Sequence, residues 1–91
     1  MELYQAKLLA TSLAGHDKGK CYVVLRQDND GYYLVDGTNK LLARPKKKNQ
    51  KHVQLIKHLP EELPEPMENI REDADVRKIL KLYDDTRNIS G

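Results

Sequence analysis

The chain has 91 residues, a formal net charge of +2 and one cysteine, Cys21, which suits one small domain and excludes an internal disulfide and a cysteine-rich zinc site. Charged residues make up 33% of the chain, but the apolar residues cluster in segments, which favours a folded domain over full disorder. No apolar run approaches the roughly 20 residues of a membrane-spanning helix, and the N-terminus lacks the apolar core of a signal peptide, so we expect a cytoplasmic protein in a reducing compartment.

Short apolar segments separated by turns fill the first part of the chain. Lys7–Ser12 predicts a first strand, and Cys21–Gln27, rich in β-branched and aromatic residues, predicts the strongest one. Tyr32–Val35 and Lys40–Arg44, each preceded by an Asp-Gly turn, predict a third and a fourth strand. His52–Ile56 predicts either a fifth strand that closes a barrel or one helical turn. Strands and turns at this spacing indicate a mainly β protein, a small barrel or sandwich.

The strand predicted at residues 21–27 is apolar on both faces. Its alternation places Tyr22 and Val24 on one face and Val23 and Leu25 on the other. We therefore expect both faces of this strand to be covered.

A proline-rich acidic segment and a helix follow the strands. Residues 60–72 contain Pro60, Pro64 and Pro66, and we interpret them as a stiff, extended linker. Residues 73–88 are predicted to form an amphipathic helix, capped by Asp73 or Asp75, with an apolar stripe at i, i+3, i+4 and i+7 formed by Val76, Ile79, Leu80 and Tyr83. This stripe either packs on the barrel or serves as a docking or dimer surface.

Residues 6–37 carry a recognisable motif. An apolar strand leads through a Gly-x-x-Lys-Gly turn at residues 15–19 into a Val-rich strand, and Leu-Val-Asp-Gly follows at residues 34–37. In this order the residues resemble the KOW motif of small bacterial KOW-domain proteins described as RNA-binding and of single-KOW large-subunit ribosomal proteins of archaea and eukaryotes. Tyr22 stands where many KOW motifs have glycine or alanine.

The resemblance covers roughly residues 6–58 and implies an SH3-like β-barrel, followed here by the C-terminal helix. The chain is then divided into a barrel at residues 1–59, the linker at 60–72 and the helix at 73–88. The resemblance also implies RNA as the partner, either ribosomal RNA or the ribosome.

The charge distribution agrees with a nucleic-acid partner. Residues 1–59 hold 11 basic and 5 acidic residues, and residues 60–91 hold 5 basic and 9 acidic residues, so a basic body precedes an acidic segment. In a KOW-like barrel the turn glycines Gly15 and Gly19 permit a positive φ and a close approach of RNA. The candidate RNA contacts are His16, Lys18, Lys20, Arg44, Lys46, Lys47, Lys48 and Lys51.

A lysine cluster with few aromatic residues suits recognition of the RNA backbone and shape. Tyr32 and Tyr33 lie on opposite faces of one strand, so we expect one of them to be exposed and able to stack on a base.

These features predict a non-catalytic RNA-binding module without cofactor or metal. Cys21 lies in an apolar strand, and His52 and His58 are six residues apart, which is not the spacing of a helical metal pair. The alternative is a protein-interaction module that docks through the barrel or the C-terminal helix to a protein partner, including the transcription machinery.

Overall fold

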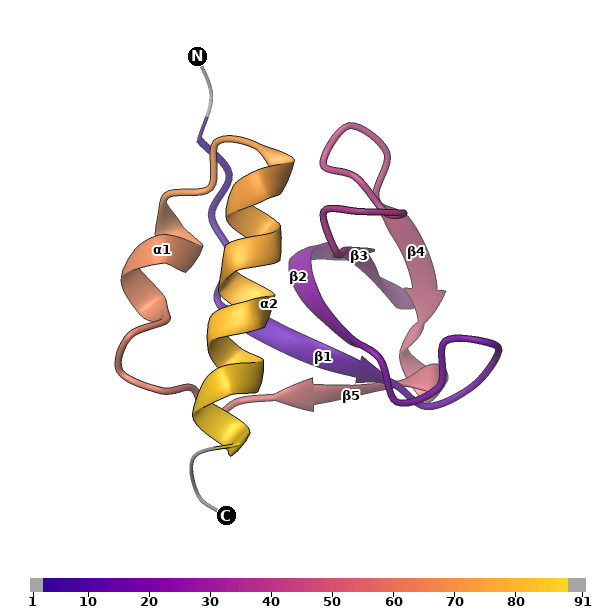
Figure 1. Cartoon of the computed structure of the whole chain (residues 1–91). Coiled ribbons are helices and arrows are strands. Elements are labelled where there is room, and N and C mark those ends of the chain that lie inside the picture. The colour runs from indigo at the N-terminus through magenta and orange to yellow at the C-terminus, as the bar shows by residue number, and fades with distance from the viewer. Residues whose placement is uncertain (1–2, 89–91) are drawn as a thin grey trace.

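A computed structural model describes residues 3–88 of the chain (Figure 1). No helix among these residues is long and apolar enough to cross a membrane. The elements in chain order are β1 (Leu8–Ser12), β2 (Cys21–Gln27), β3 (Gly31–Val35), β4 (Lys46–Asn49), the 3-10 helix η1 (Gln50–His52), β5 (Val53–Ile56), α1 (Pro64–Glu68) and α2 (Asp73–Asn88).

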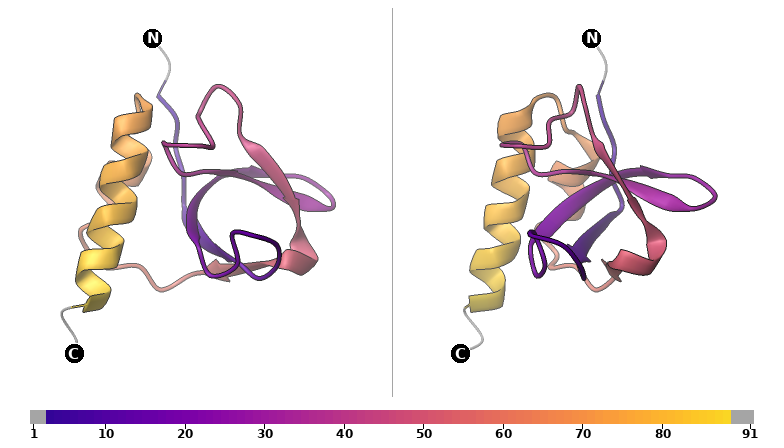
Figure 2. Two further views of the ribbon diagram at one scale, coloured as in Figure 1. Left: turned by 45° about the vertical axis from the view of Figure 1, so that its right-hand side comes forward. Right: turned by 90° about the vertical axis from the view of Figure 1, so that its right-hand side faces the viewer.

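The protein is mainly β. Five antiparallel strands form one sheet in the order β4-β3-β2-β1-β5, and the sheet curls into a half-barrel (Figure 2). The register between β2 and β3 shifts between Val24 and Arg26, and such a bulge bends the strand that carries it. The helices α1 and α2 lie side by side in one layer against the sheet (Figure 2).

The first three predicted strands are confirmed, the segment 52–56 proves to contain a strand, β5, and not a helical turn over its length, and the predicted fourth strand is wrong. The carboxylate of Asp36 accepts the backbone N–H groups of residues 38, 39 and 40 and folds the chain back. Residues 41–44 then form a second turn, closed by the N–H of Arg44 on the oxygen of Leu41 at 2.9 Å. The fourth strand is instead the lysine run Lys46–Asn49, which pairs with β3. Lysines are common on edge strands, where their charge opposes unwanted pairing with another chain.

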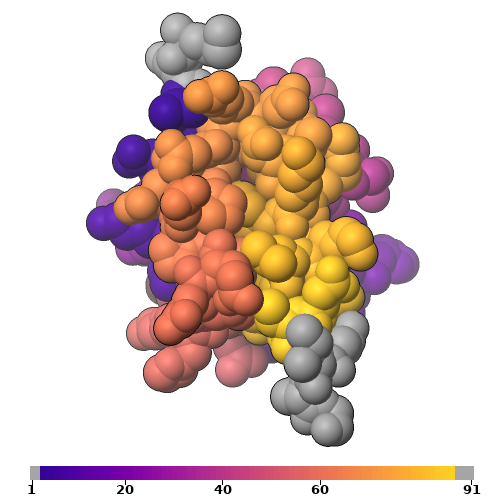
Figure 3. Space-filling view, turned by 60° about the vertical axis from the view of Figure 1, so that its left-hand side comes forward, coloured from indigo at the N-terminus to yellow at the C-terminus, as the bar shows by residue number. Residues whose placement is uncertain are grey.

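The sheet packs on both faces, as the alternation in β2 predicts. Inside the curl, Tyr22 and Val24 pack in a cluster that also contains Ala10, Leu34 and Val53. On the outer face, Val23 belongs to a second cluster that includes residues of both helices. Figure 3 shows α1 and α2 side by side over this face.

The two neighbouring tyrosines of β3 have different surroundings. Tyr32 packs against the inner cluster. Tyr33 is partly exposed, and its ring centroid lies 4.2 Å from the guanidinium carbon of Arg26.

The segment 60–72 is not extended, which corrects the interpretation from sequence. It contains α1, and Leu63, Met67 and Ile70 are buried in the outer cluster. Leu63 at the N-cap and Met67 in the helix lie four residues apart, on one side of α1, and Pro64 at the first helical position costs no hydrogen bond. Ile70 also exchanges two backbone hydrogen bonds with Tyr4, which ties the N-terminal segment to this layer.

The helix α2 packs on the sheet through its predicted stripe. Val76 and Ile79 are buried in the outer cluster, and Leu80 and Tyr83 pack against it. Asp75 lies in the first turn and reaches back out of the helix, since its carboxylate accepts the backbone N–H groups of residues 71 and 72, which precede α2; these hydrogen bonds lower its pKa. Asp73 instead accepts the backbone N–H of Leu42, at 2.8 Å.

Candidate functional site

Two basic segments that are distant in sequence meet at one mouth of the half-barrel. These segments are the β1–β2 loop, residues 13–20, and β4 (Figure 2). The ammonium nitrogen of Lys48 donates to the backbone oxygen of Ala14 at 2.9 Å and to the carboxylate of Asp17 at 3.0 Å. Lys48 therefore fixes the loop against the strand.

The loop is closed by backbone hydrogen bonds across its base. The N–H of Gly19 donates to the oxygen of Ser12 at 2.7 Å, and the N–H of Ser12 donates to the oxygen of Lys20 at 3.0 Å. Gly15 and Gly19 have φ angles of +90° and +88°, a region that favours glycine. The sequence therefore fixes the path of the loop before any ligand binds.

Asp17 is the anchor of the loop. Besides Lys48, its carboxylate accepts the hydroxyls of Tyr22 at 2.7 Å and Ser12 at 2.9 Å. The hydrogen bond from Tyr22, together with those from Lys48 and Ser12, outweighs burial and holds the pKa of Asp17 well below its usual range. Burial and the neighbouring carboxylate of Asp17 raise the pKa of Tyr22.

The roles of Asp17 and Tyr22 were missed from the sequence. The one available signal was the large phenol at position 22, where the resembling family has a small residue. That phenol reaches back from β2 to the carboxylate of the loop.

Three of the eight candidate RNA contacts are held in ion pairs within the protein. Lys20 pairs with Asp36 at 2.6 Å, and Lys48 pairs with Asp17. Lys47 pairs with Asp30 at 2.7 Å and with Asp28 at 2.9 Å. These aspartates neutralise much of the positive charge that a count of lysines suggests.

Lys47 also lies away from the mouth. It is opposite Tyr33 in the β3–β4 register, and its ammonium nitrogen lies 5.8 Å from the Tyr33 ring centroid. Since side chains alternate along a strand, Lys47 points to the outer face, and its two neighbours point to the inner face.

The side chains of the remaining five candidates are exposed, and no carboxylate of residues 3–88 forms an ion pair with them. Within residues 3–88, none of their side chains makes an ion pair or a hydrogen bond. They are His16, Lys18, Arg44, Lys46 and Lys51.

A hollow of about 290 Å³ lies between the loop and β4. We call it the basic hollow, and its lining residues are Gly15, His16, Asp17, Lys40, Lys46 and Lys48. Lys40 was not predicted from sequence, because it was assigned to a strand. The turn that Asp36 organises carries it instead to the mouth, where its ammonium nitrogen lies 5.1 Å from the Tyr22 ring centroid.

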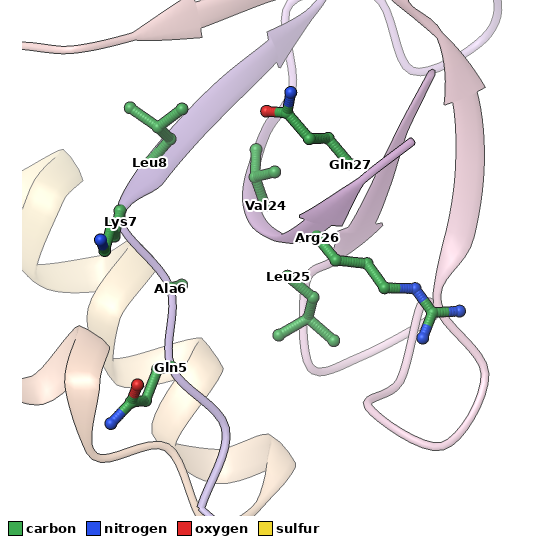
Figure 4. Close-up of a pocket in the computed structure, with 8 residues that line it drawn as sticks. All are labelled: Gln5, Ala6, Lys7, Leu8, Val24, Leu25, Arg26 and Gln27. Carbon is green, nitrogen blue, oxygen red and sulfur yellow. The ribbon is translucent and has the colours of Figure 1, made fainter. Parts of the chain in front are cut away.

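A second hollow, of about 310 Å³, lies where the N-terminal segment and β2 diverge (Figure 4). Residues 5–8 form one side and residues 24–27 the other, and Arg26 extends away from the N-terminal segment. The charged groups therefore do not converge there as they do in the basic hollow. Among residues 3–88, no group of three His, Cys, Asp or Glu side chains is placed to hold a metal ion.

Comparison of the sequence with models of known protein families gives no match, and comparison with curated proteins gives none either.

Proposed function

We propose that this protein is a non-catalytic RNA-binding module of the SH3-like, KOW type, which contacts ribosomal RNA or the ribosome through the mouth of its half-barrel. The observation that carries the proposal is the junction of the β1–β2 loop with the lysine strand β4, made by Lys48 on Ala14 and Asp17. The residues of the KOW-like turn and the lysine run thereby form one surface. Such a module acts in the cytoplasm, where ribosomes are found.

The basic residues predicted as RNA contacts divide into two groups with different tasks. Lys20, Lys47 and Lys48 are held by aspartates and maintain the shape of the sheet and loop. The unpaired side chains are free to bind phosphate oxygens, since they break no internal ion pair when they do so. This second group comprises Lys18, Arg44, Lys46 and Lys51.

Binding by such contacts depends on salt, because each phosphate that a lysine neutralises releases a condensed counterion. The logarithm of the binding constant then falls linearly with the logarithm of the salt concentration, with a slope close to the number of contacts. The slope gives a direct measure of which lysines bind phosphate.

The test compares two double variants that lose the same charge. Lys18→Ala/Lys51→Ala removes two unpaired cations from the proposed surface, and Lys78→Ala/Lys81→Ala removes two exposed lysines from α2. Affinity for a structured ribosomal RNA fragment is measured by fluorescence anisotropy between 50 and 300 mM salt, conditions of the order at which such contacts are resolved. The first variant should reduce the salt slope by about 2, and the second should leave it unchanged. Equal salt slopes for the two double variants would show that RNA binds at another surface of the protein.

Sedimentation of the protein from a cell lysate distinguishes RNA binding from the protein-interaction alternative. The stripe of α2 on which it partly rested is packed against the sheet. Sedimentation of the protein from a lysate with the large ribosomal subunit, lost after nuclease treatment and at high salt, would support the RNA contact. Co-sedimentation that survives nuclease treatment would favour a protein partner.

A further inference from the structure

The basic hollow concentrates charge. Three lysine side chains, Lys40, Lys46 and Lys48, line it together with one carboxylate, Asp17. With His16 counted as neutral, as in the formal charge of the chain, these groups leave a net charge of +2.

The carboxylate does not repel a ligand as a free one would. Both oxygens of Asp17 accept hydrogen bonds, one from Ser12 and Lys48 and the other from Tyr22. Asp17 therefore serves to hold the wall of the hollow in place.

Each ammonium group keeps at least one N–H donor that no described residue accepts. Lys48 uses two of its three N–H donors on the loop, so one is left for a ligand. Lys40 and Lys46 form no ion pair with the described residues. Gly15 lies beside these groups, since a Cβ at this position would be in van der Waals contact with Asp17 Oδ1, at 3.4 Å, and with the Lys48 nitrogen, at 3.7 Å.

We infer that the basic hollow binds a terminal phosphate of RNA, a phosphate monoester at a chain end. A monoester carries a charge of about −1.5 to −2 at pH 7 and three acceptor oxygens, which match the net charge and the three ammonium groups of the hollow. A phosphodiester within a chain carries a single negative charge and matches less well.

The size of the hollow agrees with this assignment. At about 290 Å³ it lies at the lower limit of pockets that enclose whole drug-sized ligands, about 300–1,000 Å³. It is suited to one phosphate at the end of a chain that continues over the surrounding lysines. The inference rests on the proposed function, since it names which part of an RNA occupies the site.

The test uses the full chain and three RNA oligonucleotides of one sequence, with a 5′-phosphate, a 3′-phosphate or hydroxyl groups at both ends. Dissociation constants are measured at one ionic strength. We expect one phosphorylated form to bind about tenfold more tightly than the hydroxyl form, the effect of one charge-assisted hydrogen bond. A preference for either phosphorylated end supports the inference, and the better of the two identifies that end.

Two variants show whether the preference arises in the hollow. Lys40→Ala/Lys46→Ala should lose it and keep the melting temperature, whereas Lys78→Ala/Lys81→Ala on α2 should keep it. Equal binding of all three oligonucleotides by the unaltered protein would overturn the inference and leave RNA binding intact. Absence of binding to all three and to the ribosomal fragment would overturn the proposed function itself.

Discussion

Gly37 lies where the loop after β3 meets the first turn of α2. Its φ is +78°, and a Cβ there would lie 2.5 Å from the backbone oxygen of Asp73 and 2.8 Å from Cγ of Arg77. The guanidinium of Arg77 also donates to the Gly37 oxygen at 2.6 Å. The substitution Gly37→Ala therefore adds backbone strain and overlap with the helix.

The two costs can be separated by a second glycine. Gly19 has a similar φ of +88°, but a Cβ there would meet no atom within 4 Å. Gly19→Ala should cost only the strain, about 1–2 kcal/mol. Gly37→Ala should cost that and the overlap, about 1–3 kcal/mol more. For a domain of this size the difference corresponds to about 4–24 °C in melting temperature.

The assay is thermal and urea unfolding of the original protein and both variants, followed by circular dichroism. Gly37→Ala should melt well below Gly19→Ala. Equal losses for the two variants would show that α2 does not press on the loop at Gly37, and the docking of the helix described above would be refuted.

Three further outcomes are expected. The Lys20 ammonium and backbone amides outweigh burial and lower the pKa of Asp36 to about 2. Asp36 therefore contributes about 2 kcal/mol to the free energy of unfolding above about pH 4, and this contribution is lost as the pH falls through about 2. Urea titrations between pH 2 and 7 should show this loss in the original protein and not in Asp36→Asn, and parallel curves would contradict it. Lys48→Ala should lower the free energy of unfolding by about 2 kcal/mol, since it removes two hydrogen bonds of a charged group. Lys46→Ala should change it by no more than about 0.5 kcal/mol. Thermal melts in which Lys46→Ala is the less stable variant would contradict this expectation. Ile79→Ala should lower the free energy of unfolding by about 2–5 kcal/mol, because this side chain is 1% exposed. Leu13→Ala, at an exposed position, is the control and should not show this loss. An unchanged urea midpoint for Ile79→Ala would disprove packing of α2 on the sheet.

The parts of the fold that follow a clear period could be predicted from the sequence. The two apolar faces of β2 are visible as an alternation, and the stripe of α2 as a helical spacing. Both patterns are local, and the surrounding structure reinforces them.

The errors arose where one side chain overrides a local preference. Residues 40–44 have strand-like composition, but Asp36 binds three successive amides and imposes a turn. The lysine run has little strand preference of its own and becomes β4 because the edge of β3 offers it a partner. In residues 60–72 the prolines suggested an extended chain, although one of them begins a helix.

The sequence predicts the segments that form the candidate site, but it does not predict which of their charged side chains are unpaired. The sequence shows the lysines, but which of them are neutralised depends on carboxylates brought close by the fold, such as Asp36 beside Lys20 and Asp17 beside Lys48. Lys40 reached the mouth through a turn that was taken for a strand. The division between paired and unpaired lysines is therefore a property of the tertiary structure.

The helices that cover the outer face of the sheet follow its strands in the sequence. Val23 and Val35 lie under Val76 and Ile79 in one cluster, and Ile79 follows Ile56, the last residue of the sheet, by 23 residues, which take about 1–5 s to synthesise at about 5–20 residues per second. During that interval a growing chain presents an apolar sheet surface with no helix to cover it. The nascent protein thus passes through a period of vulnerability to aggregation that the completed domain does not share.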